Sequence, residues 1–395
     1  DGSAVLAKTE TGSVTCTVVG KKTVTPLTGH TNDFFTFEEW FGTSQQIYHC
    51  CLALKSGNLF QRVVAACSRV ILATLYRLMN HFRVGVAGVG AIGKNHARVL
   101  ASLSPDHPVV IYDANPEHAA RIAEEFGGRA VSSIEELISL TDAVTVATPT
   151  SSHYAIGSQL LNAGKHVLIE KPITDDTNQA RELIELAHRQ GCVLQVGHIE
   201  RFNPVLSLLE ERMHQPIFIE AHRLSPFPNR SIDIGVVLDL MIHDLEIILH
   251  LVRSEIVNID AVGVPVLTRR EDIANARLRF ANGCVANITA SRISPEKMRK
   301  IRVFQSDCYL SLDYQEQQGK IFRKEGLAII QEDVTVEKDE PLKLELAAFV
   351  ECARLGATPK VSGQQGADAL AVALEITRLI ENNAPGASLA PTPQT

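Results

Sequence analysis

The sequence lacks an excess of basic residues, a long apolar run and paired cysteines. Its 38 Lys and Arg and 45 Asp and Glu give a net charge of −7 at pH 7, which argues against a generic surface for nucleic acid or acidic membranes. No stretch approaches the roughly 18–20 apolar residues that a membrane-spanning helix requires. We therefore expect neither a nucleic-acid partner nor a membrane partner.

Eight cysteines are present, but none forms a CxxC pair, and no His/Cys spacing resembles a zinc site. The cysteines of the main body are scattered among apolar residues, as expected of reduced thiols in a cytoplasmic protein. We therefore predict a cytoplasmic location and no metal centre.

The length of 395 residues, with 45% hydrophobic and 21% charged residues, is enough for two ordinary globular domains. Residues 1–78 show no sustained periodicity, apart from a pattern over 60–79 that favours an amphipathic helix. We expect residues 1–78 to be an extension of doubtful structure, either upstream sequence translated in error or a poorly structured segment. A genuine accessory segment is the alternative. A compact enzyme would begin near Met79.

The strongest local motif is a glycine turn between a short apolar strand and a helical pattern, in the stretch FRVGVAGVGAIGKNHARVLA (82–101). Gly88 permits the tight turn, and Gly90 lets the backbone come close to a pyrophosphate. Gly93 lets the helix pack on the strand, and the helix N-terminus faces the phosphate charge. Together with Ala91 and Ile92, these glycines are predicted to bind a dinucleotide.

Asp113 follows the second predicted strand, twenty residues after Gly93. A carboxylate at this position accepts hydrogen bonds from the ribose hydroxyls of adenosine and repels a 2′-phosphate. Asp113 therefore favours NAD over NADP. A role as a cap for the helix that starts near Pro116 is the alternative.

Strands and helices alternate as far as residue 203, which predicts a parallel sheet with helices on both faces. Ligands of such sheets lie at the carboxyl ends of the strands. Asp113, Thr148, Lys171 and His198 all follow predicted strands. Lys171, in the stretch HVLIEKPITDD, is therefore expected on the cofactor's side of the sheet and not as a solvated surface charge.

Several motifs, in this order, resemble the Gfo/Idh/MocA oxidoreductases, relatives of glucose–fructose oxidoreductase and inositol dehydrogenase. The resemblance covers about residues 82–380. It implies an α/β protein with an N-terminal Rossmann NAD-binding domain and a C-terminal α+β domain that has a largely antiparallel, open-faced sheet. The motifs are GxGxxG at 88–93, ATPTSSH at 147–153, EKPI at 170–173, GHIERFNP at 197–204 and LDLMIHDLE at 238–246.

In this family the lysine of the EKP motif lies beside the nicotinamide and the substrate, and the peptide bond before the proline is often cis. The resemblance therefore implies a catalytic Lys171, with Glu170 near the cofactor. It also places the loop with Thr148 and Pro149 against the nicotinamide ribose and makes His153 a cofactor contact. A cap or a solvent-facing position is the alternative for His153.

The second catalytic element of the family is a D-x-x-x-H pair, here Asp239 and His243. At positions i and i+4 of a helix, the two side chains share one face. His243 could be the general base for the hydroxyl proton, while Asp239 orients the imidazole or binds a sugar hydroxyl. Lys171 would stabilise the alkoxide or act as the base itself. A purely structural His243 beside Asp244 is the alternative.

Arg201 and Asn203 lie where the chain leaves the nucleotide domain, and the arginine could hold an anionic group of the substrate. A salt bridge from Arg201 to Glu200 or Glu210 is the alternative. Residues 204–383 read as about six antiparallel strands, one face packed by a helix over 238–252, followed by two further helices. Residues 384–395 read as a flexible tail. The predicted domains are thus 79–203 and 204–383.

Arg277, Arg279 and Arg292 are expected on the other face of the second sheet, which in relatives forms subunit contacts. We therefore expect a homodimer or homotetramer. The motifs are most similar to the bacterial branch of the family that oxidises the 3-hydroxyl of UDP-N-acetylglucosamine, on the way to the 3-amino sugar of lipid A. Arg223 and Arg230 are then candidates for the phosphates of a nucleotide sugar. Oxidation of a free sugar or inositol, and a non-catalytic NAD-binding sensor, are the alternatives.

Overall fold

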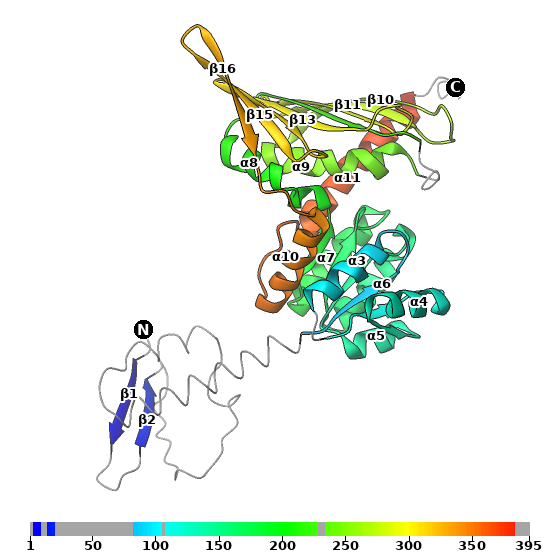
Figure 1. Cartoon of the computed structure of the whole chain (residues 1–395), viewed down its shortest axis with the longest axis vertical. Coiled ribbons are helices and arrows are strands. Elements are labelled where there is room, and N and C mark those ends of the chain that lie inside the picture. The colour runs from blue at the N-terminus through cyan, green and yellow to red at the C-terminus, as the bar shows by residue number, and fades with distance from the viewer. Residues whose placement is uncertain (1–2, 9–13, 20–81, 105–106, 228–233, 384–395) are drawn as a thin grey trace, which may run out of the picture. The chain divides into compact units, whose positions relative to one another are not determined.

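The computed structural model describes residues 3–8, 14–19, 82–104, 107–227 and 234–383. They fall into two units, Asp1–Met79 and Asn80–Thr395. In the first unit, β1 (Ser3–Lys8) and β2 (Val14–Val19) form an antiparallel pair (Figure 1), which the sequence did not predict. The rest of the predicted extension, the helix predicted over 60–79 and the predicted tail lie outside the described residues.

The second unit begins with a sheet of six parallel strands in the order β5-β4-β3-β6-β7-β8. Strand β3 has β4 on one side and β6 on the other, so the strand order reverses at β3. Nucleotides bind at this switch point in such folds. This arrangement confirms the predicted Rossmann fold. The strands are β3 (Val84–Ala87), β4 (Val110–Tyr112), β5 (Arg129–Val131), β6 (Ala143–Val146), β7 (His166–Glu170) and β8 (Leu194–Gly197).

Five helices alternate with these strands, and local signals in the sequence set their ends. Asn115 caps the start of one helix, and Gly127 ends it in a left-handed conformation. Asp176 and Gly191 do the same for another, as expected of side-chain caps and C-terminal glycines. The helices are α3 (Gly93–Leu103), α4 (Pro116–Phe126), α5 (Ile134–Leu140), α6 (Thr150–Asn162) and α7 (Thr177–Gln190).

The second sheet has eight strands in the order β10-β11-β12-β9-β13-β14-β15-β16. All neighbours are antiparallel except β12 and β9, which confirms the predicted α+β domain, although two more strands are present than the sequence predicted. They are β9 (Phe218–Leu224), β10 (Ile256–Val264), β11 (Ile273–Phe280), β12 (Val285–Ser291), β13 (Met298–Phe304), β14 (Cys308–Asp313), β15 (Gln318–Glu325) and β16 (Ala328–Thr335).

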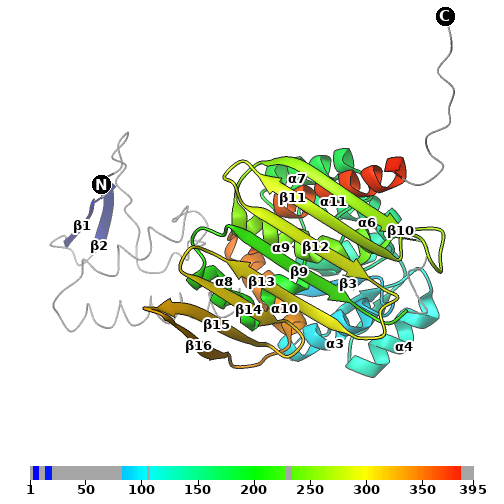
Figure 2. The ribbon, with the colours of Figure 1, turned by 90° about the horizontal axis from the view of Figure 1, so that it is seen from above.

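One face of this sheet packs on helices, and the other is open, as seen from above in Figure 2. The covered face forms a hydrophobic core with the helices beneath it, so the prediction that the helix near 238–252 packs there is confirmed. On the open face, Phe218, Phe304, Tyr309 and Phe322 stack across neighbouring strands with ring centroids 4.4–5.7 Å apart.

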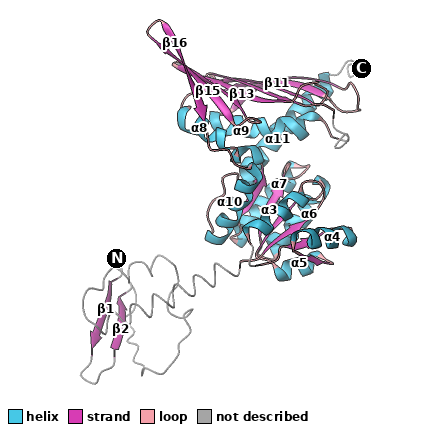
Figure 3. Cartoon of the chain, in the orientation of Figure 1, coloured by secondary structure: helices cyan, strands magenta, loops and turns pink. Residues whose placement is uncertain are grey.

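The remaining helices lie beneath the second sheet or between the two sheets, where Figure 3 shows them in cyan. The last helix contacts α7, α9 and β10, and Ser362 pairs with Gln195 of β8. The helix before it packs on α3 and η2. The C-terminal residues therefore brace both sheets. These elements are η2 (Ile199–Phe202), α8 (Pro204–Arg212), η3 (Val237–Met241), α9 (Ile242–Val252), α10 (Pro341–Leu355) and α11 (Gly363–Asn383).

Candidate active site

The glycine turn after β3 has the geometry that a dinucleotide needs. Gly88 has a φ of +84°, and a Cβ on Gly93 would lie 1.9 Å from the Gly88 carbonyl oxygen, so the fold itself requires both glycines. A Cβ on Gly90, in contrast, would meet nothing within 4 Å. The open space at Gly90 fits the close approach of a pyrophosphate.

The first turn of α3 is free to bind an anion. Ile92, at the N-cap, offers no side-chain cap, and no acidic residue lies in the first turn. Gly90, Ala91 and Ile92 are exposed. The exposed backbone before the helix and the positive end of the helix dipole favour a phosphate at this place. The turn therefore fits NAD or NADP through its backbone.

Asp113 is fixed at the end of β4. Its Oδ2 accepts a hydrogen bond from Val89 N at 2.8 Å, and its Oδ1 accepts one from Asn115 N at 2.9 Å. The carboxylate thus ties the glycine turn to the neighbouring strand and keeps a negative charge beside it, with 17% of the side chain exposed.

The loop after β6 lies against the glycine turn. A Cβ on Gly88 would come within 2.6 Å of Thr148 Cγ2, while Pro149 is exposed and precedes α6. His153 is buried, and its ring nitrogens lie 2.9 Å from the carbonyl oxygens of Thr148 and Pro172. Because both ring nitrogens face carbonyl oxygens, His153 joins the loops after β6 and β7 rather than offering a free nitrogen to a ligand. Burial lowers the pKa of His153.

Lys171 follows β7, and its peptide bond to Pro172 is cis. Its Nζ donates to the backbone oxygen of Asp239 at 2.5 Å and to Asp239 Oδ1 at 3.1 Å. Glu170 turns the other way, toward His96 Nε2 at 3.0 Å. The ammonium group is therefore directed toward the helix of the second domain, on the cofactor's side of the sheet.

His243 lies on α9, one turn after Asp239 of η3. It packs against His198, with ring centroids 5.9 Å apart and planes at 85°, and its buried Nδ1 has no partner among the described residues. Burial and then the charges of Lys171 and Arg223 lower the pKa of His243 well below its ordinary value. The ring is therefore neutral at pH 7 and has a lone pair for a proton, but it is a weaker base than an ordinary imidazole.

Arg223 lies in a buried ion network behind this histidine. It makes two hydrogen bonds to Asp244, at 2.7 and 3.0 Å, and one to Glu200 at 2.8 Å. Arg299 reaches the same Glu200 oxygen at 3.2 Å. Because Arg223 is 3% exposed, the geometry gives no support to its predicted contact with substrate phosphates. Arg230 lies outside the described residues.

Arg201 and Asn203 are also buried and engaged. Arg201 donates to Glu246 at 2.6 Å and to Glu210 at 3.3 Å, so the salt-bridge alternative describes it better than an anion site. Asn203 caps α8 and donates to the backbone oxygen of Tyr314 at 2.9 Å. Both residues thus fasten the junction between the sheets.

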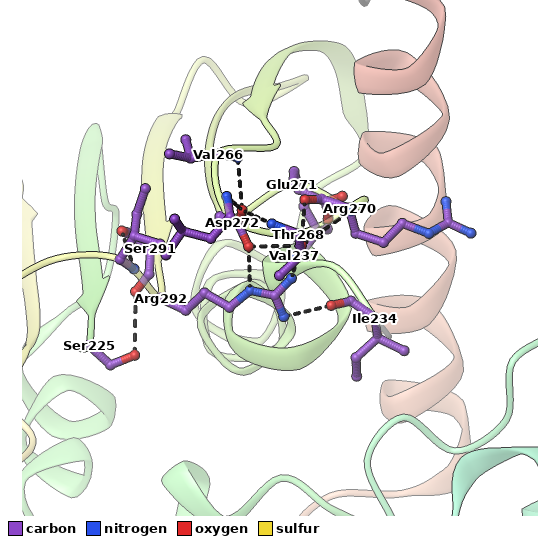
Figure 4. Close-up of polar contacts among 12 residues, drawn as sticks. Ser225, Ile234, Val237, Val266, Thr268, Arg270, Glu271, Asp272, Ser291 and Arg292 are labelled. Carbon is purple, nitrogen blue, oxygen red and sulfur yellow. Dashed lines mark hydrogen bonds and ion pairs between the residues drawn. The ribbon is translucent and has the colours of Figure 1, made fainter. Parts of the chain in front are cut away.

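A second polar cluster fixes the start of η3 (Figure 4). Glu271 accepts a hydrogen bond from Val237 N at 3.3 Å, and Arg292 donates to the backbone oxygen of Ile234 at 2.7 Å and to Asp272 at 2.8 Å. The prediction that Arg292 lies on the open face of the sheet was therefore wrong, because this guanidinium is fully buried. Arg277 and Arg279 do alternate with buried residues and face outward.

The structure thus places Asp239 between Lys171 and His243 in the chemistry of the site and leaves Arg201 and Arg223 in structural pairs. Sequence reasoning placed His198 at the ligand edge of the sheet, directly after a predicted strand, but gave it no role in the site. Among the described ranges, no group of His, Cys, Asp and Glu residues has the arrangement of a metal site. No helix in that part of the chain is long and apolar enough to cross a membrane.

Comparisons with known proteins agree with this geometry. Residues 82–198 match the model of the oxidoreductase family with an NAD-binding Rossmann fold, and residues 212–310 match the GFO/IDH/MocA C-terminal domain. The chain belongs to the Gfo/Idh/MocA oxidoreductase family. It is therefore an NAD-binding oxidoreductase by family, as the motifs predicted.

Two curated members of the Gfo/Idh/MocA family and one solved structure are similar to this chain over most of their length. UDP-N-acetylglucosamine 3-dehydrogenase of Acidithiobacillus ferrooxidans is 38% identical over 77% of this chain and 98% of its own length. Its crystal structure superposes with a TM-score of 0.73, covering 76% of this chain and 98% of that one. The scyllo-inositol 2-dehydrogenase (NAD(+)) of Bacillus subtilis is 26% identical over 77% of this chain and 95% of its own length.

Proposed function

We propose that this protein is an NAD-dependent dehydrogenase that oxidises the 3-hydroxyl of UDP-N-acetylglucosamine to the 3-keto sugar. The observation that carries the proposal is the ion pair of Lys171, at the carboxyl end of β7, with Asp239, which precedes His243 by four residues. The charge of Lys171 also acts on the His243 ring. The 38% identity to a UDP-N-acetylglucosamine 3-dehydrogenase, over nearly the whole length of that relative, supports the choice of substrate.

In this proposal the cofactor binds along the edge formed by the glycine turn, Thr148, Pro149 and the residues after β7. When bound, NAD would supply the hydride acceptor. The backbone of Gly88–Gly93 holds the pyrophosphate, and His153 keeps the Thr148 loop in place. The fixed carboxylate of Asp113 favours NAD over NADP, since it would repel a 2′-phosphate.

The protein's own residues handle the proton of the hydroxyl. His243, neutral at pH 7, accepts the proton, and the ammonium of Lys171 stabilises the negative charge that develops on the oxygen. Asp239 holds Lys171 through its carboxylate and its carbonyl oxygen, so its role is to orient the lysine and not the imidazole. This assignment makes Lys171 the electrostatic group and His243 the base.

Recognition of the nucleotide diphosphate needs cations that are free to reach it. Arg201 and Arg223 are paired within the fold, so we assign them to positioning the site. Arg299 is also paired, with Glu200 at 3.2 Å, but its side chain is 39% exposed, so it adds a partly accessible cation at this place. Arg230 stays a candidate from the sequence.

The test is the formation of NADH, followed by its absorbance, on mixing the protein with NAD and UDP-N-acetylglucosamine. We expect turnover with this substrate and much weaker activity with free N-acetylglucosamine, with the same ranking of affinities by isothermal titration calorimetry. Turnover of free inositol or a free sugar, with no response to the UDP-sugar, would assign the protein to the inositol-dehydrogenase side of its family. Binding of NAD without turnover of any sugar would favour the alternative of a non-catalytic NAD-binding sensor.

We also propose that the protein forms a homodimer or homotetramer through the open face of the second sheet. The aromatic row Phe218, Phe304, Tyr309 and Phe322 supports this, because stacked, partly exposed rings are typical of the apolar centre of an interface. Sedimentation equilibrium gives the mass directly, and a monomer at micromolar concentration would contradict the proposal.

A further inference from the structure

His198 lies inside the candidate active site and has no task in the chemistry described so far. The register of β7 and β8 pairs Glu170 with Gly197, so Lys171 and His198 follow neighbouring strand ends. His198 is 1% exposed, and neither of its ring nitrogens has a partner among the described residues. Burying a polar group without a partner costs free energy, so its presence here calls for a reason.

Within the described part of the chain, the ring of His198 packs against the ring of His243. The planes meet at 85°, the edge-to-face arrangement that aromatic rings favour. Nδ1 of His243 is buried and unpaired like both nitrogens of His198. The two rings thus orient each other by packing alone, without a hydrogen bond to the Nδ1 of the proposed base.

The charges around the pair come from several neighbouring elements. Cations approach from Lys171 after β7, Arg201 in η2, Arg223 in β9 and Arg299 in β13. The carboxylates here are engaged with those cations. They are Asp239, Glu200, Asp244 and Glu246.

This setting keeps both rings uncharged. Burial, followed by the charges of Lys171 and Arg201, lowers the pKa of His198 to about 3. A proton on His198 would add a further positive charge beside the base, so an uncharged ring is the form that fits this place.

We infer that His198 is a positioning residue for His243: its uncharged ring fixes the orientation of the imidazole and keeps water away from it. His243 then remains a neutral proton acceptor even in mildly acidic solution. This inference rests on the proposed function, in which His243 accepts the hydroxyl proton. It adds His198 as the residue that keeps His243 oriented and uncharged.

The test compares His198→Ala, which removes the ring, with His198→Phe, which keeps a ring of similar size without nitrogens. In the full chain of the wild type, we expect kcat/KM to fall with decreasing pH only below 6.5, the ordinary pKa of a histidine. In His198→Ala, water reaches His243 and raises its pKa, so this acidic limb of the pH profile moves to higher pH. The same variant loses about 10- to 100-fold in kcat at pH 7.5, as expected when a base is misplaced. His198→Phe keeps the wild-type limb and most of kcat.

An NMR titration of histidine-labelled protein gives a readout that needs neither substrate nor NAD. The His243 signal is assigned by its loss in His243→Gln, and its midpoint should move to higher pH in His198→Ala but not in His198→Phe. His198→Asn serves as a second ring-deleting variant if the alanine variant fails to fold. Should the wild type show no turnover, the proposed function fails while this titration still decides the inference. An unchanged midpoint without the ring, or a shift as large in the phenylalanine variant, would overturn it.

Discussion

Lys171→Ala is expected to slow NADH formation by about 10²–10⁴-fold, the range that a positioned group contributes in such steps. The affinity for NAD should change little, because the pyrophosphate contacts come from the backbone of the glycine turn. The ammonium lies 3.1 Å from Asp239 Oδ1, so the variant removes the positive charge at the proposed reaction centre. Single-turnover absorbance and calorimetry with NAD measure the two quantities separately.

Lys165→Ala is the matched control for this prediction. Lys165 comes just before β7, at the end opposite to Lys171, so its loss removes one lysine without touching the site. We expect wild-type turnover from the control. Wild-type turnover in Lys171→Ala as well would remove this lysine from the mechanism.

Arg223→Met is expected to lower the free energy of unfolding by about 3–5 kcal/mol, the cost of breaking a buried ion pair by removing one partner. The change leaves Asp244, 1% exposed, without the two hydrogen bonds at 2.7 and 3.0 Å that compensate its burial. Glu200 keeps Arg299 at 3.2 Å, so most of the loss should come from Asp244. Urea unfolding of both proteins measures the difference.

Arg302→Met tests whether burial is the reason. Arg302 of β13 forms a comparable pair with Glu220 of β9 at 3.1 Å, but the Arg302 side chain is 52% exposed. Exposed pairs contribute roughly 0–1 kcal/mol, so this variant should unfold nearly like the wild type. Equal losses of unfolding free energy in Arg223→Met and Arg302→Met would contradict this explanation, because burial would then make no difference.

The first domain could be predicted almost completely from the sequence, whereas parts of the second could not. Buried strands such as β3 and β6 give continuous apolar runs, and the glycine turn fixes the entry to α3. Strands β15 and β16 were missed because β16 is exposed along most of its length, so the alternation that marks a half-buried strand is weak. Asp239 lies in a short π-helix, which an i, i+4 pattern cannot reveal.

The candidate site also has a part that could be predicted from the sequence and a part that could not. Lys171 was predictable because parallel strands end at one edge, which brings together residues far apart in sequence. The partners of the arginines were not, since Glu200 meets Arg223 and Arg299 across 23 and 99 residues of chain. Sequence reasoning therefore found the cations but could not tell which were already neutralised inside the fold.

The most direct test of the central claim is a crystal structure of the protein with NAD and UDP-N-acetylglucosamine. Lys171 and His243 flank a single reacting hydroxyl in our account, so Lys171 Nζ and a ring nitrogen of His243 should both lie about 2.6–3.2 Å from the 3-hydroxyl oxygen. A complex in which the sugar ring lies away from either residue, with its 3-hydroxyl bound by other groups, would contradict the account.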